Sequence, residues 1–127
     1  MRTARDAGSA PAEFVMVAAL LTVLTLGVLQ LGVALLVRNT ALDAAAEGAR
    51  FGALADNRPA DGAVRTRELI SMAIGGEYAR DVRVTTGEWR GHPAVTVTVR
   101  TTLPVLGLLG IGEGLEVAGH AARETLG

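Results

Sequence analysis

The clearest pattern in the chain is an uncharged apolar run from Phe14 to Val37. It consists mainly of Leu, Val and Ala, and its polar side chains are Thr22, Thr25 and Gln30. As a helix rising about 1.5 Å per residue, the run reaches about 36 Å, enough to cross a hydrocarbon core of about 30 Å. Because unpaired backbone groups are not tolerated in lipid, the pattern predicts a transmembrane helix.

The helical period continues past Val37 to about residue 55. Apolar and small residues recur at steps of three and four, whereas charged residues such as Asp43 and Glu47 fall on other faces. One narrow face is made of residues small enough for close helix packing: Ala45, Gly48, Ala49 and Gly52. This face can pack within the chain or against neighbouring subunits, and the sequence leaves both interpretations open.

The second half of the chain predicts one short helix and a small antiparallel sheet of about three strands. Residues 56–62 are turn-rich, residues 63–74 have a helical period, and Gly75-Gly76 ends that helix. Apolar and polar residues then alternate at 82–85 and 95–100, which predicts strands joined through Gly91-His92-Pro93, with Trp89 as the aromatic anchor of the sheet. Leu103 to Ile111 is predicted to be a loop or single turn packing on the sheet, and Leu115 to Glu124 to be the third strand. The predicted fold class is therefore α+β, with strands between about residues 80 and 124.

Composition narrows the function classes. The net charge is −1, which gives no electrostatic reason to expect nucleic-acid binding, and the chain has no Cys, so it has no disulfide framework or thiol nucleophile. His92 and His120 lack companions at metal-ligand spacing. Gly110, Gly112 and Gly114 alternate but lack the context of a dinucleotide fingerprint. We therefore expect no enzyme activity, cofactor, metal or small-molecule substrate.

The apolar run has two interpretations, a retained anchor or a cleaved secretory signal. The apolar region of a cleaved signal is typically about 7 to 15 residues long, so the length favours an anchor. Arg2 and Arg5 precede the run, against Arg38 alone close behind it. The positive-inside rule then predicts a cytoplasmic N-terminus and a domain outside the cytoplasm.

Glu13 is an acidic residue directly at the start of the apolar run. A carboxylate drawn to the middle of a bilayer costs roughly 2.5–3.5 kcal/mol. In the simplest interpretation Glu13 marks the lipid boundary and favours the positive helix N-terminus. Pro11 fits that interpretation, since the first turn of a helix does not need its missing N–H.

Two sequence blocks together resemble the TadE-like family of minor pseudopilins of tight-adherence (Flp-type, type IV pilus-like) systems. The first block is Gly8-Ser9-Ala10-Pro11-Ala12-Glu13-Phe14, and the second extends from Val37 to Arg50. The resemblance implies a class III signal peptide, cut by a prepilin peptidase between Gly8 and Ser9, so that Glu13 becomes the fifth residue. It also implies roles for Glu13 and Phe14 in assembly or peptidase recognition. Ala19 departs from the family pattern, where many members carry a proline.

The resemblance divides the chain into a cytoplasmic leader (1–8), a transmembrane helix (9–37) and an extracytoplasmic pseudopilin domain (38–127). Its implied partners are the membrane, a prepilin peptidase, other pilin-like subunits and inner-membrane pilus platform proteins. The expected function is a structural component of a pilus assembly apparatus in the cell membrane or a surface pilus. The alternative is an unprocessed, signal-anchored scaffold or binding module of a cell-envelope complex. A membrane-tethered enzyme is the least supported hypothesis.

Overall fold

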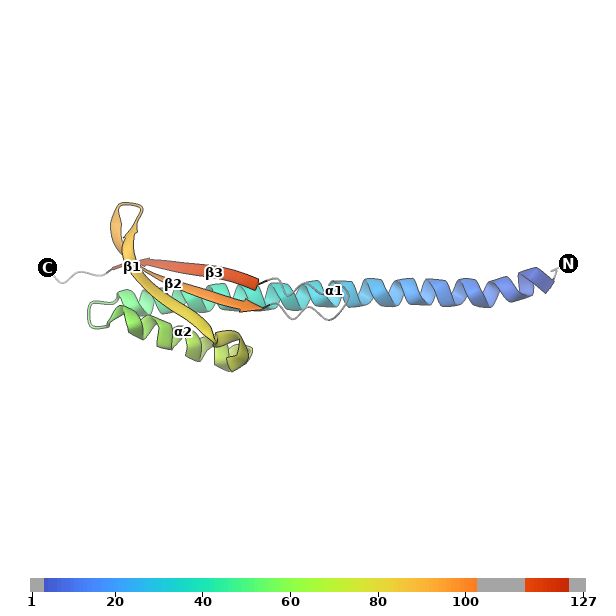
Figure 1. The fold of residues 1–127 in the computed structure, drawn as a ribbon, viewed down its shortest axis with the longest axis horizontal. Helices are drawn as coiled ribbons and strands as arrows, with labels where there is room; N and C mark the ends of the chain where they lie inside the picture. Colours follow the sequence, from blue (N-terminus) through green and yellow to red (C-terminus); the bar gives the residue numbers. More distant parts are fainter. Residues whose placement is uncertain (1–3, 103–113, 124–127) are drawn as a thin grey trace. The chain divides into compact units, whose positions relative to one another are not determined.

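The computed structural model describes residues 4–102 and 114–123 (Figure 1). The chain divides into two compact units, Met1–Val33 and Ala34–Gly127. The predicted apolar turn at Leu103–Ile111 lies outside the described residues, as do Gly110, Gly112 and Glu124.

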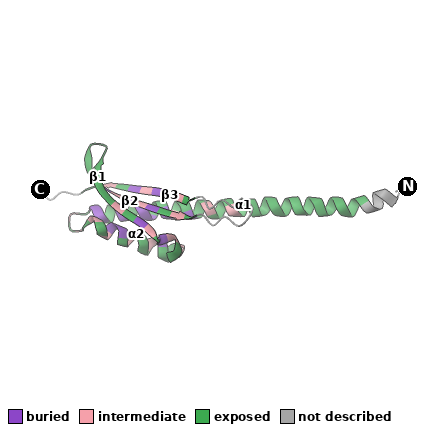
Figure 2. Ribbon diagram, viewed as in Figure 1, coloured by how far each residue is buried: buried purple, intermediate pink, exposed green. Residues whose placement is uncertain are grey.

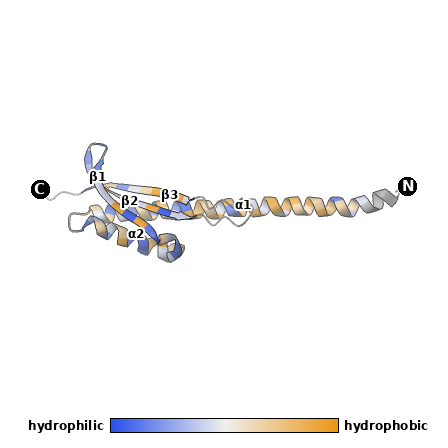
Figure 3. Cartoon of the chain, in the orientation of Figure 1, coloured by the Kyte–Doolittle hydropathy of each residue, from blue (hydrophilic) through white to orange (hydrophobic). Residues whose placement is uncertain are grey.

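Helix α1 extends from Ala4 to Ala53, and its first part makes up the described portion of the first unit. The Thr22 hydroxyl donates to the Ala18 carbonyl at 2.8 Å, so this polar side chain is satisfied by its own helix. Among the described residues, α1 is the one helix long and apolar enough to cross a membrane. Its apolar residues appear in Figure 3 as a nearly continuous hydrophobic segment.

A short turn connects α1 to helix α2, which extends from Pro59 to Ala73. The prediction placed residues 59–62 in a linker, and this was wrong. Pro59 occupies one of the first two helical positions, and the Asp61 carboxylate accepts the Arg58 N–H at 2.8 Å. A proline pre-set for helical φ and an acidic side chain in the first turn both favour an earlier helix start.

The second unit also contains a 3₁₀ helix, η1 (Gly76–Ala79), and three strands, β1 (Asp81–Trp89), β2 (His92–Thr102) and β3 (Gly114–Ala122). The strands form one antiparallel sheet in the order β1-β2-β3. This arrangement confirms the predicted α+β class, with its long N-terminal helix, short second helix and three-stranded sheet.

The β1–β2 turn differs from the predicted Gly91-His92-Pro93. Trp89 pairs with His92, so the turn residues are Arg90 and Gly91. Their φ angles are 52° and 79°, and positive φ at both central positions is the conformation that matches the twist of a two-residue hairpin. Pro93 lies within β2 instead, and its carbonyl accepts the Arg123 N–H at 2.8 Å.

The central strand supplies the core of the second unit. Val95, Val97 and Val99 are all fully buried, and they share one face of β2 because side chains alternate along a strand. Val97 and Val99 belong to the same core cluster as Ile70 of α2. Figure 2 shows the buried residues in purple on the strands and on the helices of the unit.

A close contact joins α1 to α2 at Gly48 and Gly62. A Cβ added at Gly62 would lie 2.5 Å from the Gly48 carbonyl oxygen, and one added at Gly48 would overlap the Thr66 side chain. Thr66 is fully buried, and its hydroxyl lies 2.8 Å from the Gly62 carbonyl and 3.3 Å from that of Ala44. Two helix backbones can approach this closely only where both residues lack a side chain.

We predict that Gly48→Ala destabilises the second unit by about 1–3 kcal/mol, because the added methyl overpacks the contact with Thr66 and Gly62. In an open helix position the same change would stabilise by about 1 kcal/mol, so the sign of the effect tests the contact. The measurement is denaturant unfolding of the full chain in non-ionic detergent, followed by the fluorescence of Trp89, the chain's single tryptophan.

Gly87→Ala is the matched control, because nothing lies within 4 Å of the position its methyl would take. It should change the unfolding midpoint much less. Equal midpoints for the two variants would contradict the proposed tight contact.

Candidate assembly site

The predicted processing and assembly residues lie together on the N-terminal part of α1. Gly8, Ser9, Glu13 and Phe14 are all helical. The Ser9 hydroxyl donates to a Glu13 carboxylate oxygen at 3.4 Å across one helical turn, and both side chains are exposed. The carboxylate therefore has one local polar contact and remains accessible to a further donor.

Pro11 lies inside α1 rather than in its first turn, because the helix begins at Ala4. A proline in a helix interior lacks the N–H that would bond to the preceding turn. In the chain as described, Pro11 is therefore an unfavourable residue near the start of a long helix.

The apolar part of α1 exposes its side chains on all sides within the first unit. Phe14 is 75 % exposed and Met16 71 %, and Leu20, Leu24 and Leu31 are each more than half exposed. A helix that is hydrophobic all round requires lipid or other apolar helices around it. The first unit therefore has the surface of a candidate single-pass membrane helix.

The small-residue face beyond the apolar run is used inside the second unit. Ala45 and Ala49 are fully buried, and Gly48 and Gly52 contact α2 near Gly62. On the sheet side, a Cβ added at Gly119 would overlap the backbone of Ala45 and Ala46. Of the two interpretations left open by the sequence, packing within the chain is the one observed.

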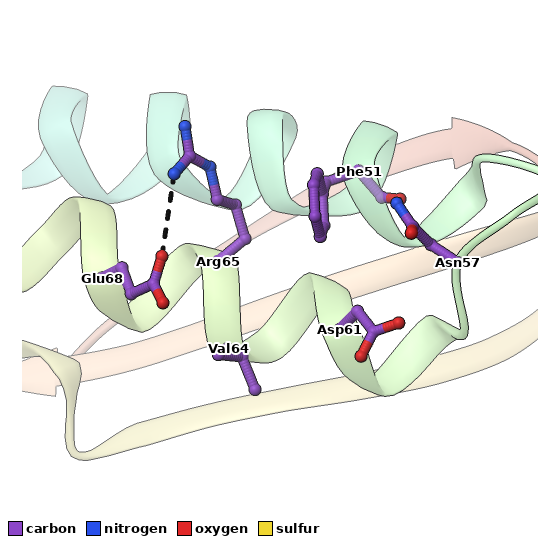
Figure 4. Close-up of a pocket in the computed structure, with 6 residues that line it drawn as sticks. All are labelled: Phe51, Asn57, Asp61, Val64, Arg65 and Glu68. Atoms are coloured by element: carbon purple, nitrogen blue, oxygen red, sulfur yellow. Dashed lines mark hydrogen bonds and ion pairs between the residues drawn. The ribbon is translucent and has the colours of Figure 1, made fainter.

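A shallow groove of about 280 Å³ lies along the outer side of α1 and α2 (Figure 4). Phe51 points into it from α1, and Asp61 and Arg65 line it from α2. Arg65 forms an ion pair with Glu68 at 3.6 Å, and both side chains are substantially exposed. This groove brings together no nucleophile and base, and an exposed pair of this kind contributes little to stability.

Trp89 anchors the outer face of the sheet rather than its core. It is 39 % exposed, and its indole stacks on the His120 ring with centroids 5.0 Å apart and planes at 4°. The Arg90 guanidinium lies 4.5 Å from the indole centroid, and the Thr96 hydroxyl lies 2.8 Å from His120 Nδ1. The register places Ala94 between the two rings, and Ala94 is only 3 % exposed. The stack therefore connects β1 to β3 across the intervening strand.

Neither histidine is part of a metal-binding cluster in the described part of the chain. Within residues 4–102 and 114–123, no three His, Asp, Glu or Cys side chains come together in a way that could hold a metal ion. His92 pairs with Trp89 at the hairpin and His120 is taken up by the stack. Within the described residues, His92 therefore takes part in strand pairing and His120 in a ring stack.

Sequence reasoning missed four residues that organise the second unit: Thr66, Arg67, Gly62 and Gly119. Arg67 of α2 donates to the Val82 carbonyl of β1 at 3.0 Å, and the two glycines provide the close approaches of α1. Of these four residues, only Gly62 could have been found from the sequence. A glycine in a predicted helix could have been matched to the small-residue face of α1 as its packing partner. The others become informative only when the partner element is known.

The second unit and the apolar helix together define a small α+β protein with one candidate membrane helix. Comparison with known families then gives a more specific result: a family model described as TadE-like protein matches residues 8–50. The match covers both blocks that carry the resemblance and confirms it for this part of the chain. It includes Gly8, Ser9, Glu13 and Phe14, together with the small-residue face. Neither the curated proteins nor the solved structures gave a match to the chain.

We predict that His120→Ala shifts Trp89 emission to longer wavelength and lowers the stability of the second unit by about 0.5–1.5 kcal/mol, because the stacked ring is lost. Steady-state fluorescence and denaturant unfolding of the full chain in detergent measure both effects. His92→Ala is the matched control, since no ring contact is observed for His92 among the described residues. Indistinguishable spectra for the two variants would rule out the stack in solution.

Proposed function

We propose that this protein is a minor pilin-like subunit of a tight-adherence pilus apparatus, cut by a prepilin peptidase between Gly8 and Ser9. The observation that carries the proposal is the TadE-like match over residues 8–50, which begins at the proposed cleavage residue. The protein is anchored by α1, with its N-terminus in the cytoplasm and the second unit outside. It acts as a structural component and not as an enzyme.

The position of Pro11 supports cleavage on physical grounds. In the uncut chain Pro11 lies in the interior of α1, where its missing N–H breaks a helical hydrogen bond. Cleavage after Gly8 would make Pro11 the third residue of the mature chain. Its missing N–H is then one of the groups that a first turn leaves unpaired in any case. Processing would thus turn an unfavourable residue into a neutral one.

The exposed carboxylate of Glu13 supports a role in subunit contact. Its observed local partner is the neutral Ser9 hydroxyl, at the long distance of 3.4 Å. When apolar helices pack side by side, a buried carboxylate needs a cationic partner. The new amino group of Ser9 on a neighbouring subunit supplies one, and this pairing would favour one axial offset between helices.

The partners follow from this arrangement. The apolar surface of α1 contacts lipid before assembly and other pilin-like helices or inner-membrane platform proteins afterwards. The prepilin peptidase acts on the segment around Gly8 to Phe14. No cofactor, nucleic acid or small-molecule substrate enters the proposal.

We predict that Gly8→Val prevents processing, because a branched side chain would replace the residue that precedes the cut bond. Mass spectrometry of membrane-extracted protein, made with its partner peptidase, should find the unchanged protein starting at Ser9 and the variant uncut. If the unchanged protein keeps its leader under these conditions, the pilin proposal fails. A signal-anchored scaffold of an envelope complex then becomes the better hypothesis.

We predict that Glu13→Val leaves membrane insertion and processing largely intact but lowers recovery in sheared or assembled filament fractions. Glu13→Gln should behave similarly, because it keeps a polar side chain but removes the charge that pairs with the Ser9 amine. Quantitative immunoblotting of membrane and sheared fractions measures the ratio.

Glu47→Val is the control, since Glu47 is exposed on the second unit and its ion pair is with Arg50 at 3.9 Å. Its recovery should be unchanged. Normal incorporation of both Glu13 variants would remove the role assigned to the carboxylate.

A further inference from the structure

The edge of β3 that faces away from β2 is open. The Arg123 N–H donates to the Pro93 carbonyl, which fixes the alternation of hydrogen-bonded pairs between β2 and β3. Every second residue of β3 must then direct its N–H and C=O outward. These residues are Gly114, Glu116, Ala118, His120 and Ala122. Within the described residues, no backbone hydrogen bond reaches these outward groups.

The opposite edge of the sheet is partly capped. The two-residue turn makes Trp89 and His92 a hydrogen-bonded pair, so Val82, Val84, Thr86 and Glu88 direct their backbone groups away from β2. The Arg67 guanidinium donates to the Val82 carbonyl, in agreement with this assignment. One outward carbonyl of β1 is therefore occupied by α2, and the edge from Val84 to Glu88 remains available.

The two open edges have the same chain direction. Both β1 and β3 are antiparallel to β2, so they are parallel to each other. If β3 of one copy lies beside β1 of a second copy, the new pair is parallel, and each added copy presents another free β3. A contact between two β3 edges could instead form only once, as an isolated pair.

In one register of this parallel pair, the side chains of β3 lie opposite side chains of β1 that are complementary in charge and size. It places Glu116 opposite Arg83 of the second copy, and Ala118 opposite its Thr85. Glu116 is already paired with Arg100 at 3.0 Å, and Arg83 with Asp81 at 3.1 Å, and all four side chains are at least 40 % exposed. The pairing would join them into a row of alternating charge.

The same register places the bulky outer side chain of β3 where the second strand has none. His120, with its stacked Trp89, would lie opposite Gly87 of the second copy. Nothing lies within 4 Å of the position that a Gly87 side chain would take. The second strand thus leaves room for the ring stack.

The helix beside the β1 edge carries unpaired apolar surface. Val64 is 51 % exposed and Met72 83 %. Both line a shallow depression of about 430 Å³ that also includes Arg67, the residue that caps β1. A second copy joined at the β1 edge would approach this side of α2 and reduce the exposure of these side chains.

We propose that the second unit assembles with further copies of itself by parallel pairing of the β3 edge of one copy with the β1 edge of the next. Within one copy Glu116 and Asp81 both pair with Arg100, so they lie at the same level of the sheet. Placing Glu116 beside Arg83 shifts the next copy by two residues, about 6.6 Å at about 3.3 Å per residue. The contact joins two different edges, so it can repeat from copy to copy rather than stop at a dimer.

The test uses cysteine cross-linking, which is clean because the natural chain has no Cys. The full-length double variant Ala118→Cys/Thr85→Cys is oxidised in native membranes and separated by non-reducing electrophoresis. It should give a ladder of dimers, trimers and larger species. Each single variant alone should remain monomeric, and the two single variants mixed should give only dimers.

Ala118→Cys/Thr98→Cys is the matched control, because Ala118 and Thr98 are directly paired across β2 and β3. It should close a disulfide within one chain, without multimers, and so report that the sheet is folded and the oxidant effective. If this control closes while Ala118→Cys/Thr85→Cys stays monomeric, the proposal is overturned. Dimers from Ala118→Cys alone, at the yield of the double variant, would overturn it too, in favour of β3–β3 pairing.

This proposal does not depend on the pilin function, and the two can fail separately. A ladder from protein that still carries its leader after expression with the partner peptidase would support edge pairing and contradict the pilin proposal. Protein that starts at Ser9 but gives no ladder would support the pilin proposal and contradict edge pairing.

Discussion

The second unit depends on the contact between Gly48 of α1 and Gly62 of α2. With no Cβ on either residue, the two helix backbones come close enough for the buried Thr66 hydroxyl to lie near carbonyl groups of both helices. Because the backbones of α1 and α2 lie so close together, a sheet of only three strands is wide enough to cover both helices. The valines of β2 then need to fill only a thin core, which suits a chain with 3 % aromatic residues.

A glycine also allows close backbone approach where the sheet packs against α1. Gly119 of β3 lies against the backbone of Ala45 and Ala46, so strand and helix are in direct backbone contact. Large side chains are placed instead on the outer face of the sheet, where Trp89 and His120 join β1 to β3. A small domain that cannot bury bulky residues inside gains stability by stacking them outside.

Much of this fold could be predicted because the relevant signals are local. The apolar run gave α1, and the change to a two-residue period gave the strands, since both patterns reflect burial on one face of an element. Errors arose where two local signals competed. Residues 59–62 contain proline and glycine, which suggested a loop, but Pro59 starts α2 and Gly62 is needed for its contact with α1. The partner of Trp89 could not be predicted, because His120 is distant in the sequence and carries no local signal.

The position of β3 has a consequence for how the protein is made. Gly119 belongs to the last of the described strands, yet it touches Ala45 of α1. Contacts of such long sequence separation form late, because a large loop must close before they can stabilise anything. Because β3 follows α1 in the chain, the small-residue face of α1 is synthesised first and is still uncovered when β3 is made. The second unit can therefore close only after β3 has been synthesised, because Gly119 is needed to cover Ala45 and Ala46 of α1.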